Sequence, residues 1–168
     1  MNFISNPLDY LRTQARYYEV TKVANHILDN PDFAFWSGSS EEKSHHYGDG
    51  GLLQHTAEVV SLCLSNAKAF SPGKEIDQRL LYLAALYHDV GKLWDYGHFQ
   101  ELGNIRVWRA TPHKTKIYHI PRSHAEWVKV ADYERLPQYD TDEVSHAILA
   151  HHGLREWGSP VSPRTRLS

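Results

Sequence analysis

The chain has 168 residues, of which 41% are hydrophobic and 23% charged, a composition typical of a globular protein with one packed core. It has no run of about 18 apolar residues and no basic-then-apolar amino terminus, so we expect no membrane span, no secretion signal and a cytoplasmic location. The net charge of -2 gives no general attraction to polyanions, and a single cysteine, Cys63, excludes an internal disulfide or a zinc site of several thiolates.

The first half of the chain predicts helices separated by one long loop. An Asn-Pro pair is a helix start, and apolar residues then recur with helical spacing, so we expect one helix, straight or kinked, within residues 1–30. Residues 31–51 are rich in glycine and serine and predict a loop. Further helices are expected at about 52–70 and 76–88, and the second of these is apolar enough to lie in the core.

The second half begins with a segment of different character. Residues 104–110 and 114–120 have strand-like composition and are joined by Thr-Pro-His, so they predict a small β-hairpin insertion near 104–120. Two more helices and a tail follow. We expect Ser123 to cap one helix, Asp140 or Thr141 to cap the next, and residues 154–168 to form an extended tail lying on the body of a single domain, 1–168.

The number of histidines, 12, is high, and their placement is uneven. Histidine is the commonest side-chain metal ligand and titrates nearest neutral pH, so this excess predicts a metal site, proton chemistry, or both. We expect His26, His98 and His113 to be ordinary surface or core residues. The candidates at or near predicted helix ends are His55, His88 with Asp89, His124, and His151 with His152.

Helices packed in a bundle can aim such residues into one pocket. Imidazole and carboxylate without thiolate suit Mn, Fe, Co, Ni or Zn. Asp89 is the one acidic residue embedded in the histidine set, so it is the natural bridge between two ions. Two such ions polarise a phosphoryl oxygen and activate a water, which implies hydrolysis.

Three separated motifs carry a resemblance to a known family. With His55 and YHDVGK, the sequence resembles the HD-domain metal-dependent phosphohydrolase superfamily. HHYGDGGLLQHT is similar to the entry motif of YhaM-type 3′-to-5′ exoribonucleases and of conjugative-transfer HD proteins, and HAILAHHGLREWGSP to the late YhaM-type motif. The resemblance implies an all-α HD-domain bundle of five or more helices, one or two divalent ions (Mn, Fe, Ni, Co, Zn or Mg), and hydrolysis of phosphoesters.

The same resemblance assigns metal ligands residue by residue. His55, His88 and Asp89 match the ligands of the first metal. His124 and His151 match positions that hold a second metal together with the bridging Asp89. His152 matches a ligand or a phosphate contact, and with Asp89 it is a candidate catalytic residue.

Other residues are candidates for contact with substrate. Lys92 follows HDVG where the superfamily commonly has lysine, and its ammonium would hold the scissile phosphate; the alternative is a solvated lysine at a helix end. His45 and His46 lie in a glycine-rich loop that would close over the substrate, or they are surface residues. His146 precedes His151 by more than one turn, so we expect it behind the ligands rather than among them.

One departure from the family pattern concerns a last aspartate ligand. Such families usually supply it from a helix after the SPVSPRT-like segment, and no acidic residue follows Glu156. Three alternatives are open: Asp95 or Glu101 substitutes, water completes the first metal, or the domain is a shortened and inactive member.

Between Leu102 and Ala125 there are basic residues and no acidic one. In the predicted hairpin they alternate with Trp108, Ile117 and Tyr118, so bases would stack on the aromatic side chains while cations meet phosphates, or the aromatics pack on the core instead. The candidates for phosphate contact are Arg106, Arg109, Lys114, Lys116 and Arg122.

The function predicted is therefore that of a metal-dependent phosphohydrolase. It would cleave nucleotides or the 3′ ends of short single-stranded nucleic acids with a metal-activated water. The alternative is a nucleotide-binding module of reduced catalytic power, and a purely structural metal site comes last. The sequence leaves the oligomeric state open, a homo-oligomer included.

Overall fold

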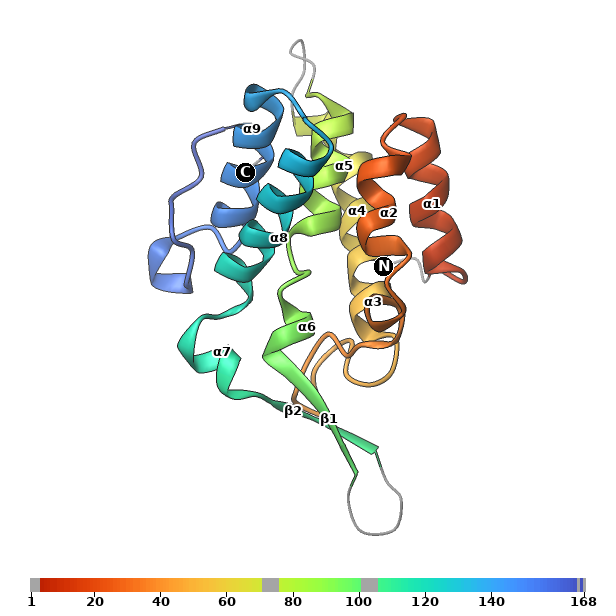
Figure 1. The fold of residues 1–168 in the computed structure, drawn as a ribbon, viewed down its shortest axis with the longest axis vertical. Helices are drawn as coiled ribbons and strands as arrows, with labels where there is room; N and C mark the ends of the chain where they lie inside the picture. Colours follow the sequence, from red (N-terminus) through yellow and green to blue (C-terminus); the bar gives the residue numbers. More distant parts are fainter. Residues whose placement is uncertain (1–3, 71–75, 101–105, 166, 168) are drawn as a thin grey trace.

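The computed structural model describes residues 4–70, 76–100, 106–165 and 167, and it is mostly helical (Figure 1), which confirms the expected helical bundle with a small hairpin. No helix in these ranges is long and apolar enough to cross a membrane. The helices are α1 (Pro7–Tyr17), α2 (Thr21–Leu28), α3 (Pro31–Phe35), α4 (Gly51–Phe70), α5 (Gln78–Tyr87), α6 (Lys92–Asp95), α7 (Pro112–Lys116), α8 (His119–Tyr133), α9 (Gln138–Ala150) and the 3₁₀ helix η1 (Arg155–Trp157). The strands are β1 (Tyr96–Gln100) and β2 (Arg106–Ala110).

Helix α5 is the centre of the core, in contact with α4, α8 and α9 (Figure 1). Every residue from Leu80 to Tyr87 is buried, as expected for a helix that is apolar on all sides. Two buried tyrosine hydroxyls find backbone acceptors: that of Tyr82 donates to the carbonyl of Leu11 (3.0 Å) and that of Tyr87 to the carbonyl of Val23 (2.7 Å). These bonds tie the amino-terminal helices to the centre of the bundle.

The expected single helix within residues 1–30 is wrong, because the chain forms two helices there. Asn6 caps α1 by accepting from the backbone of Asp9, as the Asn-Pro pair indicates. The chain then turns at Glu19, whose φ of 58° lies in the left-handed region and cannot continue a helix. Apolar residues keep a helical spacing on both sides of the turn, because both helices bury apolar side chains in the same core.

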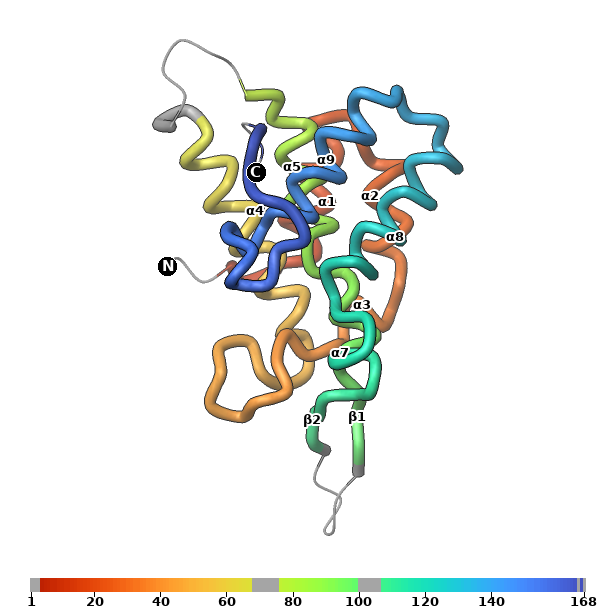
Figure 2. Tube along the Cα trace, turned by 90° about the vertical axis from the view of Figure 1, so that its left-hand side faces the viewer, coloured from red at the N-terminus to blue at the C-terminus, as the bar shows by residue number. Residues whose placement is uncertain are grey.

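The expected loop at 31–51 is largely present, but its first residues form the short helix α3. Asn30 caps this helix and Pro31 occupies its first position, a start signal overlooked among the polar residues. The remaining loop, orange in Figure 2, folds back on itself where the Gly38 amide donates to the carbonyl of His46 (2.9 Å). It leads directly into α4.

The hairpin exists, but one of its two strands was assigned wrongly. β2 pairs antiparallel with the preceding β1, from Tyr96 opposite Ala110 to Gln100 opposite Arg106. The expected second strand, 114–120, is instead α7 and the start of α8. Thr111 caps α7 and Pro112 takes its first position, so the Thr-Pro pair begins a helix rather than a hairpin turn.

The last two long helices begin earlier than expected. α8 starts at His119, so Ser123 lies inside it, where its hydroxyl accepts from the Gly91 amide (2.8 Å) instead of capping. α9 starts directly after Pro137. Behind η1 the tail runs back along the outside of α9 (Figure 2), and the Arg164 amide donates to Nε2 of His146 (3.0 Å). His146 therefore holds the tail and does not stand behind the metal ligands.

Candidate metal centre

Two groups of potential metal ligands meet at the ends of four helices. Within each group the ligand atoms all lie within 4.8 Å of one another. The first group comes from α4 and from the residues that end α5, and the second from the first residue of α8 and the residues that end α9. The first group is His55, His88 and Asp89, and the second is His119, His151 and His152.

The carboxylate of Asp89 lies between the two groups. Its Oδ2 is 3.0 Å from Nε2 of His55 and 3.3 Å from Nε2 of His88. Its Oδ1 is 3.3 Å from Nε2 of His119 and 3.6 Å from Nε2 of His151. One carboxylate with each oxygen facing a different pair of imidazoles has the arrangement needed to bridge two ions.

Hydrogen bonds at the far side of the rings fix which nitrogen carries the proton. Nδ1 of His88 and of His151 donates to a backbone carbonyl at 2.7 Å, and Nδ1 of His152 does so at 3.0 Å. A carbonyl oxygen only accepts, so Nδ1 holds the proton and, in the neutral ring, Nε2 presents a lone pair. These Nε2 atoms are therefore available as metal ligands.

Several of these buried atoms have no hydrogen-bond partner among the described residues. They are Asp89 Oδ1, His119 Nε2 and His151 Nε2, and the Nε2 atoms of His55 and His88 lie only 3.2 Å apart. Buried polar atoms are normally satisfied, and a buried polar atom without a partner costs free energy. A divalent cation between them removes this cost, so the residues present fit a metal.

The protonation states suit metal binding as well. Burial lowers the pKa of His55 and of His151, in spite of the nearby Asp89 carboxylate, and so keeps both rings neutral at pH 7. Burial acts to raise the pKa of Asp89, but the neighbouring His88, Lys92, His151 and His55 side chains outweigh it and hold that pKa well below its ordinary value. The centre thus combines an ionised carboxylate with neutral rings at His55 and His151.

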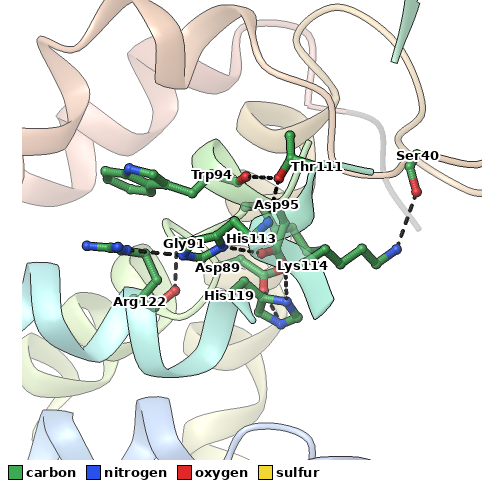
Figure 3. A network of polar contacts seen from close by, with 12 residues as sticks. Ser40, Asp89, Gly91, Trp94, Asp95, Thr111, His113, Lys114, His119 and Arg122 are labelled. Carbon is green, nitrogen blue, oxygen red and sulfur yellow. Dashed lines mark hydrogen bonds and ion pairs between the residues drawn. The ribbon is translucent and has the colours of Figure 1, made fainter. Parts of the chain in front are cut away.

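A second carboxylate, Asp95, stands behind the ligands (Figure 3). It is fully buried, and its Oδ2 accepts from Nδ1 of His119 (3.1 Å) while its Oδ1 accepts from Nδ1 of His113 (2.7 Å). Arg122 extends this series of hydrogen bonds by donating to Nε2 of His113 (3.3 Å). The alternative that Asp95 replaces a last ligand is therefore wrong, because both its oxygens are engaged in holding histidines. Glu101, the other alternative, lies outside the described residues.

His119 takes the place that the sequence analysis gave to His124, which belongs to neither group. Five residues along an α-helix turn the side-chain direction by about 140°, so the two rings cannot face the same centre. The strand-like composition of KTKIYHI hides the helix start that brings His119 into the second group. Pro121 was the available signal, since proline is tolerated in the first turn of a helix and so places the start of α8 near His119.

The candidate substrate residues lie close to the first ligand group. Nζ of Lys92 is 2.7 Å from Asp89 Oδ2. His45 and His46 line a pocket together with His55 and Lys92, and Nε2 of His46 is 3.2 Å from a Glu58 carboxylate oxygen. Their loop therefore adjoins the centre, and its closure over a substrate stays a prediction.

The basic residues between 102 and 125 do not form one alternating strand surface. Arg106 and Arg109 belong to β2, Lys114 and Lys116 to α7, and Arg122 to α8. Lys114 lies over the ring of Tyr96 and Arg122 over the ring of Trp94, each at 5.0 Å.

The proposed stacking on Trp108 is wrong. Its ring is only 2% exposed and packs against Phe35 and Trp36, while its indole N–H donates to Asp49 (3.0 Å). Ile117 is exposed, and the ring of Tyr118 packs on that of His119. Of the two alternatives for Trp108, the structure therefore shows packing in the core.

The sequence profile of the HD domain matches residues 52–167, the part of the chain that holds both ligand groups. This chain belongs to the HD domain family. The short dipeptide of that name is His88-Asp89 here, and the structure places it where α5 ends and the two groups meet.

Three relatives of this HD domain carry the name 3′-5′ exoribonuclease YhaM. Those of Bacillus licheniformis and Bacillus subtilis are 26% and 25% identical to it over 147 residues, which are 88% of this chain and 44% of theirs. That of Oceanobacillus iheyensis is 29% identical over 124 residues, 74% of this chain and 36% of the relative. The chain thus spans less than half the length of these relatives. No solved structure matches it.

Proposed function

We propose that this HD domain is a metal-dependent phosphohydrolase that cleaves phosphoester bonds in nucleotides or at the 3′ ends of single-stranded nucleic acids. The observation that carries the proposal is the position of Asp89 between two groups of histidines. Its Oδ1 and the Nε2 atoms of His119 and His151 are buried and have no hydrogen-bond partner among the described residues. A structural site would be closed by its ligands. Here, two pockets open onto the first ligand group.

In this proposal His55, His88 and Asp89 hold one divalent ion, and Asp89, His119 and His151 hold a second, with His152 beside it as a further ligand or a phosphate contact. Imidazole and carboxylate ligands suit Mn, Fe, Co, Ni or Zn. Bound ions supply an activated water and polarise the phosphoryl oxygen. The protein supplies the fixed direction of each Nε2 through the hydrogen bond at its Nδ1.

Lys92 is the residue proposed to hold the scissile phosphate. Its ammonium neutralises Asp89 at 2.7 Å and lines both pockets beside the centre. Ions bound at Asp89 would take over that neutralising role, which leaves Lys92 available for an incoming phosphate. Compact ammonium groups suit this contact.

The substrate class follows from the relatives and from the local charge. The name exoribonuclease supports a nucleic-acid substrate, and we propose that the exposed side chains of Arg109 and Lys116 contact phosphates away from the cleaved bond. Arg106, Lys114 and Arg122 stay candidates for further phosphate contacts. Phosphate contacts of this kind position a strand without reading its sequence.

The deciding experiment measures metal content and hydrolysis together. Purified protein is analysed for metals and tested with Mn²⁺ against nucleotides and short RNA and DNA oligomers. We expect Asp89→Ala to lose both metal and activity, whereas Asp132→Ala, at an exposed position on α8, retains both. Full metal occupancy in Asp89→Ala would contradict the bridging role. Binding of metal and nucleotide without turnover in the wild type would identify a binding module instead.

A further inference from the structure

Tyr118 has a backbone conformation that tyrosine rarely adopts. Helix α7 leads directly into α8 (Figure 1), and Tyr118 is the last residue before α8 begins. Its φ is 74° and its ψ is 156°. A positive φ combined with an extended ψ is populated almost only by glycine, because a Cβ crowds the backbone there. Strain of this kind persists only where the surrounding structure imposes it, and it is concentrated at functional sites.

Other residues with a positive φ have an ordinary explanation that does not apply to Tyr118. Glu19 (58°) and Arg135 (55°) each follow the end of a helix, and the amide of the next residue donates back into the last helical turn, at 2.9 Å in both cases. A left-handed residue at this position is a common way to end a helix. Tyr118 instead precedes a helix, and its ψ lies outside the left-handed helical region.

Contacts on both sides of Tyr118 hold its backbone in place. On the α7 side, the carbonyl of His113 accepts from the Tyr118 amide (3.0 Å), and Nδ1 of the same histidine donates to Asp95 (2.7 Å; Figure 3). On the α8 side, Nδ1 of His119 donates to the other oxygen of Asp95 (3.1 Å), and the backbone of His119 lies against Gly91. A rotation about the N–Cα bond of Tyr118 would move one side against the other and break these contacts.

The ring of Tyr118 lies against two histidines of the second ligand group. Its centroid is 4.1 Å from that of His119 and 6.0 Å from that of His152, with interplanar angles of 50° and 77°. A hydrogen bond at Nδ1 sets the direction of an imidazole but leaves the ring able to tilt about that bond. A neighbouring aromatic ring restricts this tilt. Glycine would adopt the backbone conformation without strain, but it has no ring to offer.

We propose that Tyr118 is a positioning residue of the metal centre. Its ring restricts the tilt of His119 and His152, so that their Nε2 atoms keep the direction that a metal ion requires, and the strained backbone is the consequence of placing an aromatic ring at this junction. This inference rests on the metal centre of the proposed function and adds to it a residue that is not itself a ligand.

Two replacements separate the ring from the strain. Tyr118→Ala removes the ring and keeps the strained backbone, whereas Tyr118→Gly removes both. We therefore expect the glycine variant to have the higher midpoint of urea denaturation without metal, the reverse of the usual order of glycine and alanine. Both variants should bind Mn²⁺ about tenfold more weakly than the wild type in isothermal titration calorimetry. If affinity only followed stability, the glycine variant would bind better than the alanine variant.

Tyr118→Phe keeps the ring and should restore the wild-type affinity. Bound Co²⁺ gives a second readout, because its visible absorption depends on the arrangement of its ligands. At saturating Co²⁺ we expect a changed spectrum in Tyr118→Ala and the wild-type spectrum in Tyr118→Phe.

Glu19 offers a matched control, since it is exposed, has a positive φ and belongs to neither ligand group. We expect Glu19→Gly to be more stable than Glu19→Ala, the same order as at Tyr118. Mn²⁺ affinity should stay at the wild-type value in both Glu19 variants, because no ring beside the centre is removed.

Specific outcomes would overturn the inference. Wild-type Mn²⁺ affinity in a folded Tyr118→Ala protein would show that the ring positions neither histidine. A loss in Tyr118→Phe as large as in Tyr118→Ala would assign the effect to the hydroxyl, and equal stability of the alanine and glycine variants would contradict the strain. Metal binding is measured without turnover, so a wild type that binds Mn²⁺ but hydrolyses nothing would contradict the proposed function alone. A wild type that binds no Mn²⁺ would contradict both.

Discussion

Asp95 accepts hydrogen bonds from Nδ1 of both His113 and His119 and is fully buried. An asparagine at this position has one acceptor oxygen, so it can satisfy only one of the two rings and presents a donor to the other. We therefore expect Asp95→Asn to lower the affinity of the centre for Mn²⁺ by about 10- to 100-fold, the usual effect of replacing a hydrogen-bond partner of a metal ligand. Isothermal titration calorimetry measures this affinity.

The control for this variant is Asp132→Asn, on the exposed side of α8. It makes the same chemical change without touching a histidine of the centre, so the affinity should stay at the wild-type value. Unchanged Mn²⁺ binding in a folded Asp95→Asn protein would show that Asp95 has no part in positioning His119.

At the scale of elements, the close approach of α6 and α8 sets the position of His119. Gly91 has helical angles (φ -59°, ψ -16°), where alanine normally stabilises by about 0.4–1 kcal/mol. Here, however, an added Cβ would lie 2.1 Å from the carbonyl oxygen of His119, a backbone atom that cannot rotate away. We expect Gly91→Ala to lower the free energy of unfolding by about 1–3 kcal/mol, measured by urea denaturation.

Gly97→Ala provides the comparison. The atoms nearest its added Cβ belong to the side chains of Phe99 and Thr111, at 3.0 Å or more, and Phe99 is half-exposed and can move. Its effect on the free energy of unfolding should therefore be small. A stabilised Gly91→Ala protein with wild-type Mn²⁺ affinity would contradict the tight contact between α6 and α8.

At the scale of the whole molecule, metal binding should stabilise the fold because the ligands come from four separate helices. An ion that binds only the folded chain adds about 2.7 kcal/mol at a hundredfold excess over its Kd, which for this size of protein raises Tm by about 5–10 °C. Differential scanning calorimetry with Mn²⁺, and then with a chelator, measures the shift. The same shift in Asp89→Ala would place the ions elsewhere.

The metal-free protein should lose stability in mild acid. Burial lowers the pKa of His55 and His151 below the ordinary 6.5, so below pH 6.5 the unfolded chain binds protons that the folded chain does not. The free energy of unfolding therefore falls as the pH drops through 6.5 toward the lowered values. Urea denaturation with a chelator from about pH 8 to pH 5 measures this slope.

The expected result includes a weaker slope in His55→Gln, which removes one of the two groups responsible. With saturating Mn²⁺ the loss in acid should be steeper, because protons compete with the metal for the same nitrogens. A constant or rising stability between about pH 8 and pH 5 would contradict this account of the buried histidines.

The sequence by itself determined the helical bundle and most of the chemistry of the centre. The spacing of apolar residues predicted α4 and α5 almost to their ends, because the buried face of a helix is made by residues close together in the sequence. His55 and His88 with Asp89 stand at or near those ends, and His151 stands at the end of α9. Imidazole with carboxylate already indicates a divalent metal.

Only the tertiary structure decided which histidine completes the second group and what Asp95 does. The choice of His119 over His124 depends on where α8 begins, and the pairing of β1 with β2 depends on a partner that composition did not reveal. Asp95 holds the ring of His119, which is 24 residues away in the sequence. The two residues meet because Gly91, which has no side chain, lets α6 and α8 approach closely. Local patterns encode elements, whereas such contacts arise only when the elements pack together, and this is why they could not be predicted from the sequence.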